Sequence, residues 1–233
     1  NVDTVSMVES LGLSYILNRA EPLGRFMSLA GGDGSVWLVD GTKRHQVDPS
    51  LLYAWGYYPG IRNVVSSNLF SRYTAADSAT QYASSNGGSS AWLIEASTKR
   101  PFKDTATKNG YVGASAITNV GQPALDLLGN GQSLTRFGYN TSNGQWFMID
   151  RGTKYYISKA ELASLWGKSP AEPITPLLSD TLSRLTNGGN LSYTGRSVSS
   201  AAYWLIAKNK HYIPSSAVNV ALTGSSSAPA VFS

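Results

Sequence analysis

The sequence predicts a mainly β fold with short helices, built from four repeats that close into a four-bladed, propeller-like ring. A hairpin pattern of an apolar strand, a turn and a basic strand begins at Trp37, Trp92, Phe147 and Trp204. A fixed period of this size indicates a repeat architecture. A lone hairpin is only marginally stable, so neighbouring repeats are expected to bury one another's apolar faces.

The predicted repeats divide a single domain into residues 23–78, 79–133, 134–190 and 191–233. Residues 1–22 precede the first hairpin and have the pattern of the end of a repeat, because ILNR at 16–19 matches LFSR at 69–72. We expect residues 1–22 to complete the fourth repeat, which would close the ring. The alternative is an open array of which this chain is an excised piece.

The first repeat has the clearest signals. WLVDGTKRHQV reads as a hairpin with an Asp-Gly turn. Asp48, Pro49 and Gly56 have the types expected at the N-cap, first position and end of a helix over 48–56. A strand over 62–67 and a short helix over 67–73 complete the repeat.

The later repeats follow the same order with looser sequences. Hairpins are predicted over 92–103 and 202–213, and strand 134–138 is expected to pair with 146–150. Ser158 and Glu161 form a capping box that predicts a helix over 158–167. The other predicted helices cover 123–129 and 179–185, while 105–110 has only a weak helix signal.

Composition limits the class of protein. Charged residues make up 14% of the 233 residues, against about 25% in typical globular domains, so Ser, Thr, Asn and Gly supply much of the polar surface, as is common in secreted proteins. The absence of cysteine excludes a disulfide framework and a thiolate metal site. No apolar stretch reaches the roughly 20 residues of a membrane span, and no signal peptide begins at Asn1.

The net charge of +5 is compatible either with ordinary surface charge or with an anionic polymer as partner. Each of the first three hairpins also carries an acid before a lysine. These pairs are Asp40 and Lys43, Glu95 and Lys99, and Asp150 and Lys154, while the fourth hairpin has Ala207 and Lys210. They predict either an ion pair that fixes the hairpin register or a polar binding site repeated at each turn.

Aromatic and basic side chains supply the candidate ligand contacts. The hairpin-initial aromatics are expected in the core, whereas Tyr57 and Tyr58 precede a Pro-Gly loop, where exposed rings can stack on sugars or bases. The variable second strands of the hairpins supply the rest. The predicted ligand-binding residues are Tyr57, Tyr58, Arg44, His45, Arg100, Tyr155, Tyr156, His211 and Tyr212.

Catalytic signals are weak. The two histidines, His45 and His211, occupy near-equivalent places in different hairpins, which disfavours a shared site. No zinc-protease, nucleophile-elbow, P-loop or dinucleotide motif is present. We predict no catalytic residue, no metal and no cofactor, although a glycan-active hydrolase with two distant carboxylates stays open as an alternative.

WLVDGTKRHQVDPSLLYAWGY resembles the unit of a tandem hairpin–helix repeat of secreted and cell-surface proteins of Gram-positive bacteria, especially actinobacteria. The match is good in the first repeat, fair in the third and fourth, and poor in the second. The resemblance implies a secreted or cell-surface, non-catalytic module whose partner is cell-wall polysaccharide or another surface glycan. A protein adhesion or scaffold module is the alternative, and nucleic acid is not expected as a partner.

Overall fold

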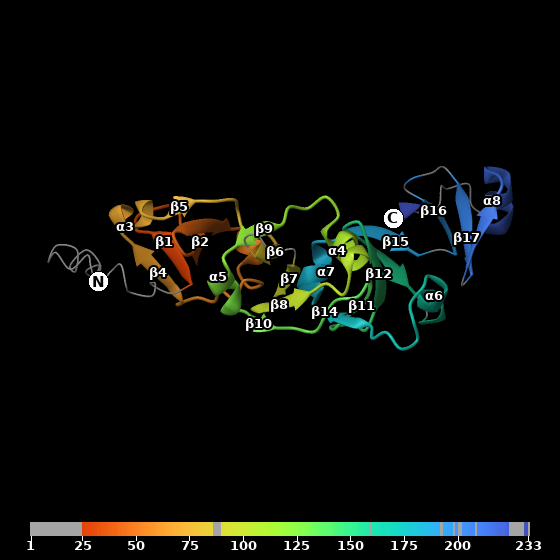
Figure 1. Cartoon of the computed structure of the whole chain (residues 1–233), viewed down its shortest axis with the longest axis horizontal. Helices are drawn as coiled ribbons and strands as arrows, with labels where there is room; N and C mark the ends of the chain where they lie inside the picture. Colours follow the sequence, from red (N-terminus) through yellow and green to blue (C-terminus); the bar gives the residue numbers. More distant parts are fainter. Residues whose placement is uncertain are drawn as a thin grey trace. The chain divides into compact units, whose positions relative to one another are not determined.

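The computed structural model describes residues 25–85, 90–158, 160–191, 193–197, 199, 202–207, 209–223 and 231–232. Four sheets of four or five strands carry short helices (Figure 1), which confirms the mainly β fold. The described residues form two compact units, one up to Pro101 with Ala116–Gly131, the other Phe102–Ser115 with the part from Gln132 onward. The predicted completion by residues 1–22 lies outside the described residues, and ring closure stays a prediction.

The first repeat folds as one five-stranded sheet in the order β4-β1-β2-β3-β5. Its strands are β1 (Phe26–Leu29), β2 (Val36–Asp40), β3 (Lys43–Val47), β4 (Arg62–Val65) and β5 (Thr74–Ala75). β1, β2 and β3 are antiparallel, β4 runs parallel to β1, and β5 runs parallel to β3. The predicted hairpin is therefore confirmed, and the two parallel strands flank it.

The helices of the first repeat are shorter than the sequence suggested. The Asp48 side chain accepts from the Ser50 amide as predicted, but the element that follows is a 3-10 turn, η1 (Pro49–Leu51). Gly56, at φ 81, lies beyond several turn residues, so the prediction of one helix over 48–56 is wrong. α3 (Ser67–Ser71) is capped by the Ser66 hydroxyl, which accepts from the Leu69 amide.

The second repeat repeats this sheet order, and α5 (Gln122–Asp126) takes the place of α3. The strands are β6 (Tyr82–Ser85), β7 (Ala91–Glu95), β8 (Thr98–Pro101), β9 (Thr118–Val120) and β10 (Gly129–Asn130). Phe26, Leu38 and Trp55 of the first repeat share a core with Ile94 and Leu125 of the second. This shared core confirms that adjacent repeats bury each other's apolar faces in the first unit.

The second unit holds the third sheet, ordered β14-β11-β12-β13-β15. Its strands are β11 (Phe137–Asn140), β12 (Trp146–Asp150), β13 (Thr153–Ile157), β14 (Thr175–Leu177) and β15 (Thr186–Asn190), and its helices are α4 (Thr105–Val112), α6 (Ala160–Leu165) and α7 (Ser179–Ser183). α4 forms where the helix signal was weak, because Asp104 caps it and Gly110 lets its backbone approach the Ile149 carbonyl.

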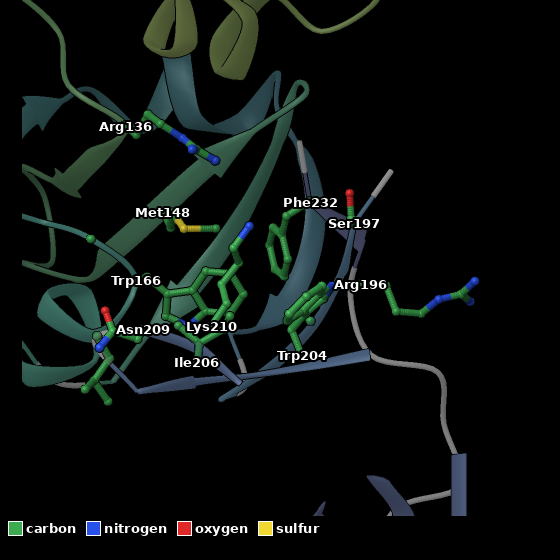
Figure 2. Close-up of a pocket in the computed structure, with 13 residues that line it drawn as sticks. Arg136, Met148, Trp166, Arg196, Ser197, Trp204, Ile206, Asn209, Lys210 and Phe232 are labelled. Atoms are coloured by element: carbon green, nitrogen blue, oxygen red, sulfur yellow. The ribbon is translucent and has the colours of Figure 1, made fainter. Parts of the chain in front are cut away.

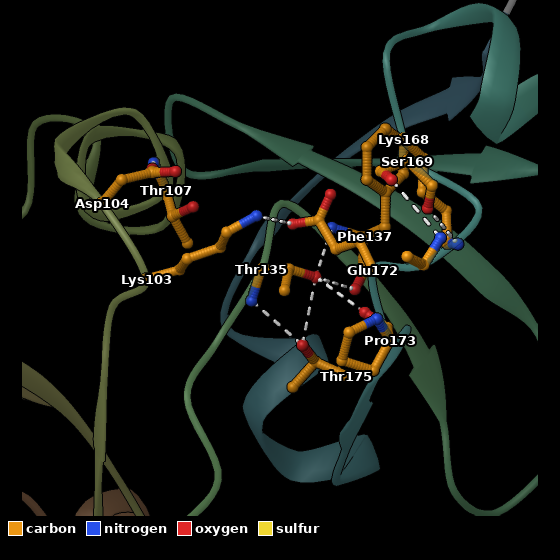
Figure 3. A network of polar contacts seen from close by, with 11 residues as sticks. Lys103, Asp104, Thr107, Thr135, Phe137, Lys168, Ser169, Glu172, Pro173 and Thr175 are labelled. Atoms are coloured by element: carbon orange, nitrogen blue, oxygen red, sulfur yellow. Dashed lines mark hydrogen bonds and ion pairs between the residues drawn. The ribbon is translucent and has the colours of Figure 1, made fainter.

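Threonine side chains join the start of β11 to its parallel neighbour β14 in the third sheet (Figure 3), and the start of β6 to β9 in the second sheet. The Thr135 amide donates to the Thr175 hydroxyl at 3.0 Å, and the Thr135 hydroxyl donates to the Phe137 carbonyl at 2.8 Å. Thr80 and Thr118 repeat the first of these contacts in the second repeat, at 2.8 Å. These buried hydroxyls replace backbone hydrogen bonds where the parallel strands begin, which fixes the register between them.

The fourth sheet has the order β18-β17-β16-β19. In the chain, α8 (Ser216–Thr223) lies between β18 and β19. Its strands are β16 (Thr194–Ser197), β17 (Tyr203–Ala207), β18 (Asn209–Ile213) and β19 (Val231–Phe232). Among the described residues β18 has no parallel neighbour of the kind that β3, β8 and β13 have. Four of the five β18 residues are exposed.

No helix in the described part of the chain is long and apolar enough to cross a membrane.

Candidate functional site

A groove of about 500 Å³ lies on the third sheet, beside α7 and β15. Polar side chains from four separate segments converge on it. Its lining is Asn140, Gln145, Phe147, Lys154, Tyr156, Ser179, Leu182, Ser183, Asn187, Gly189 and Asn190. A concave site with several convergent polar groups and an aromatic wall is the usual form of a small-ligand site.

One end of the groove is fixed by a hydrogen-bonded turn. The Ser179 hydroxyl at the start of α7 donates to Asn140 Oδ1 at 2.9 Å and lies within hydrogen-bond distance of the Ser142 hydroxyl, at 3.0 Å. The Ser142 amide donates to the same Asn140 oxygen at 2.9 Å. Since Asn140 ends β11, this network ties the loop before β12 to the helix, and the Asn140 side chain holds a defined orientation.

The opposite wall is aromatic and carries one cation. The half-buried ring of Tyr156 packs edge-on against Phe147, with ring centres 6.4 Å apart. Lys154 Nζ donates to the Leu182 carbonyl at 2.6 Å. This carbonyl is in the last turn of α7, where a cation is favoured by the helix dipole, so Lys154 holds the helix on the sheet.

The lining suits a neutral, hydroxyl-rich ligand. Amide and hydroxyl side chains both donate and accept hydrogen bonds, and the Tyr156 ring offers an apolar surface. None of the described residues that line the groove is an aspartate or glutamate, so this site lacks the paired carboxylates of a glycosidase. Among the described residues, no three His, Cys, Asp or Glu side chains gather in a way that could hold a metal ion.

Three of the predicted ligand-binding residues are buried in structural contacts. His45, 2% exposed, contacts Asp40 Oδ2 through Nε2 at 3.3 Å and the Asp77 carbonyl through Nδ1 at 2.7 Å. Arg100 forms an ion pair with Glu95 at 2.6 Å. Tyr155 lies in the core of the second unit, where burial raises its pKa. All three side chains thus make contacts within the fold, and their role in ligand binding stays a prediction.

Two further candidates also support the fold. The Arg44 guanidinium lies over the rings of Trp37 and Phe70, at 5.2 and 4.2 Å from their centres, and donates to the Phe70 carbonyl at 3.0 Å. Tyr57 packs edge-on against Phe26, with centres 5.4 Å apart. Both side chains are only partly accessible, because each closes the edge of a hydrophobic cluster.

The remaining candidates are exposed and are divided between the two units. Tyr58 is 63% exposed in the first unit, while Tyr212, 61% exposed, lies beside His211 on β18 in the second. Tyr212 packs against Trp204, with ring centres 5.7 Å apart. Of the nine predicted residues, Tyr156 lines the groove. The sequence pattern found this aromatic residue because it lies on the variable strand of a hairpin.

The strand register shows what the repeated cation does. In each of the first three hairpins, a cation lies opposite the residue that precedes the hairpin acid: Arg44, Lys99 and Lys154. Lys43 instead lies opposite the acid itself, Asp40, so Arg44 is the counterpart of Lys99 and Lys154. Each donates to a carbonyl of the short helix in its own repeat. The acceptors are Phe70 at 3.0 Å, Leu125 at 3.0 Å and Leu182 at 2.6 Å. The cation position thus holds a helix on the sheet.

The hairpin acids have different partners. Asp40 accepts the Gly121 amide, the N-cap of α5, at 2.9 Å from each of its oxygens. Glu95 binds Arg100, and Asp150 binds Arg136 at 2.5 Å. These contacts support the structural interpretation of the acid positions, but with partners other than the predicted lysines.

Sequence reasoning missed most of the groove. Its amides come from the polar loops around β12 and from β15, whose sequence TNGGN has no strand pattern. Asn and Gly favour turns, so this segment reads as a loop. The available signal was the concentration of Asn, Ser and Gln at residues 140–145 and 187–190.

Comparison with known proteins identifies no family. No family model matches the sequence, and none of the curated proteins matches it. Among solved structures, the chain is similar to the periplasmic assembly of the ESX-5 inner membrane complex, with 11% identity over 72% of this chain and 67% of that one and a TM-score of 0.23. It is also similar to the EccB3 dimer of the ESX-3 core complex, with 13% identity over 73% and 72% and a TM-score of 0.24. TM-scores of this size do not establish a shared fold and carry no argument about function.

Proposed function

We propose that this chain is a non-catalytic module, secreted or displayed on the cell surface, that binds cell-wall polysaccharide or another surface glycan. The observation that carries the proposal is the groove of the third repeat, where amides and hydroxyls surround the ring of Tyr156. A glycan presents hydroxyl groups to such side chains and the apolar face of its ring to an aromatic residue.

Two further features support this choice of ligand. The groove lining has a single cation, Lys154, and that cation is already bonded to the Leu182 carbonyl, which favours a neutral saccharide over an anionic polymer at this site. The resemblance of the first hairpin and the residues after it to repeats of Gram-positive surface proteins favours the same class. Both features support glycan binding as the proposed function.

A glycan array and a pull-down on purified cell walls test the proposal. We expect the wild-type chain to bind and Tyr156→Ala to bind about tenfold or more weakly, as is typical of losing one stacking ring. Asn190→Ala, at an exposed position of the groove, should weaken binding without affecting folding. Tyr193→Ala is the matched control, because Tyr193 is 56% exposed and does not line the groove.

Failure of the folded wild-type chain to bind any wall or array glycan would overturn the proposal. Unchanged binding by both groove variants would also contradict it. Retention of a surface protein instead of polysaccharide in the pull-down would support the adhesion or scaffold alternative. Far-ultraviolet circular dichroism on each variant confirms that the fold is intact.

A further inference from the structure

A second cavity, of about 310 Å³, lies in the second unit beside the fourth sheet, and we call it the cavity of the fourth repeat. Figure 2 shows Trp166, Phe232 and Lys210 gathered around the same space, whereas the Arg196 guanidinium points away from it. Small-molecule sites span about 300–1,000 Å³, so this cavity fits a small, compact guest. Its apolar lining comes from Met148, Leu165, Trp166, Trp204, Ile206 and Phe232.

The aromatic walls of this cavity are held in place by packing over a glycine. The rings of Trp166 and Phe232 are tilted by 60° to one another, with centres 4.3 Å apart. A Cβ atom at Gly195 would lie 2.9 Å from an atom of each ring, closer than a Cβ atom packs in a folded protein. Because residue 195 is glycine, the two rings lie directly over β16 and present a defined apolar surface to the cavity.

The fourth repeat carries positive charge without a carboxylate to balance it. Residues 191–233 contain Arg196, Lys208 and Lys210 but no aspartate or glutamate. Ala207 stands where each of the other three hairpins has its acid. None of the described residues that line the cavity is an aspartate or glutamate. An anion that enters the cavity therefore meets attraction from the repeat and no opposing carboxylate in the lining.

Lys210 is the cation that the cavity offers to such an anion. Its Nζ lies 5.3 Å from the centre of the Trp204 ring, and among the described residues it forms no ion pair. The Arg136 guanidinium also lines the cavity, but Asp150 already neutralises it at 2.5 Å. An ammonium group beside an apolar wall attracts an anion more strongly than one surrounded by water, because the local dielectric constant is lower.

We propose that the cavity of the fourth repeat binds a small organic anion with a flat apolar body, of the class of aromatic carboxylates. The aromatic ring packs against Trp166 and Phe232, and the carboxylate pairs with Lys210. Burial of the ring removes apolar surface from water, which is the main driving force. Among the described lining residues the neutral polar side chains are Ser197, whose hydroxyl is bonded to Ser199, and Asn209. A sugar would leave most of its hydroxyl groups without partners there, so this site differs from the glycan groove and does not depend on it.

Calorimetric titration of the full chain with naphthoate tests the proposal, with naphthamide as a neutral probe of the same shape. We expect saturable binding of naphthoate, and binding of naphthamide that is weaker by about fivefold, because only the carboxylate pairs with an ammonium group. Glucuronate carries the same charge on a sugar ring. It should bind more weakly than naphthoate, since it lacks the apolar body.

Changes in the cavity give the decisive comparison. Lys210→Ala should weaken naphthoate binding by about fivefold and leave naphthamide binding unchanged, whereas Trp166→Ala should weaken binding of both probes. Lys43→Ala is the matched control, because Lys43 is an exposed hairpin lysine outside the cavity, and circular dichroism checks that each variant is folded.

Three results would overturn the proposal: no saturable binding of naphthoate, equal affinity for naphthoate and naphthamide, or naphthoate binding that Lys210→Ala does not alter. Tighter binding of glucuronate than of naphthoate would also contradict it, because the ligand class would then be an acidic sugar. Lys210 does not line the groove of the third repeat, so Lys210→Ala should behave as the wild type in the glycan pull-down. Failure of this proposal is thereby distinguished from failure of the proposed function.

Discussion

The first and fourth hairpins carry histidine at the same ladder position, yet the two side chains have opposite surroundings. His45 lies opposite Leu38 and is buried, whereas His211 lies opposite Leu205 and is exposed. Asp40 contacts His45 at 3.3 Å, and Ala207 stands at the Asp40 position of the fourth hairpin. The hairpin pattern thus sets the strand pairing, while the packing around it decides which side chains are structural.

Trp55 and Trp166, which precede Gly56 and Gly167, should differ most in how much unfolding free energy is lost when each is replaced by alanine. Trp55 is fully buried and donates from Nε1 to the Thr80 carbonyl at 2.9 Å, whereas Trp166 is half-buried and lines the cavity of the fourth repeat. Trp55→Ala should cost about 3–5 kcal/mol of unfolding free energy, and Trp166→Ala clearly less. Urea unfolding of the two variants measures this; equal losses would contradict the comparison.

The histidines provide the next test. His45→Ala removes the partner of Asp40 and of the Asp77 carbonyl, so it should cost about 1–3 kcal/mol. His211→Ala removes an exposed side chain and should change the unfolding free energy by no more than about 0.5 kcal/mol. Thermal unfolding of both variants at one pH makes the comparison, and a large loss for His211→Ala would show that β18 is covered in solution.

Local elements could be predicted from the sequence, whereas elements that depend on distant residues could not. The hairpins were predicted correctly because each contains its own alternating strands and turn. The short parallel strands, such as Thr74–Ala75, were missed because two residues carry no pattern and become a strand only by pairing with β3. The groove combines Asn140 with Asn190, which the chain separates widely, so Tyr156 was found from its hairpin but its polar neighbours were not.

The helix caps give the smallest expected effect. The N-cap residue of α5, Gly121, has no side chain to cap the helix, and its own amide donates to Asp40, 81 residues earlier. By contrast, α4 is capped locally by Asp104, which accepts from the Thr107 amide at 2.7 Å. This hydrogen bond holds the pKa of Asp104 below its ordinary value of 3.8. The ionised cap therefore stabilises the fold above pH 3.8, and that stabilisation is lost as the pH falls through the lowered pKa.

Asp104→Ala should accordingly cost about 1 kcal/mol at neutral pH, and the difference from the wild type should shrink as the pH falls below 3.8. Asp104→Asn keeps an acceptor but cannot ionise, so it should lie close to the wild type at neutral pH and lose less stability on acidification. Denaturant unfolding between pH 2.5 and 7, with steps of about one unit in this acid range, measures all three proteins. A constant gap between the wild type and Asp104→Ala across that range would show that the carboxylate charge does not contribute to the cap.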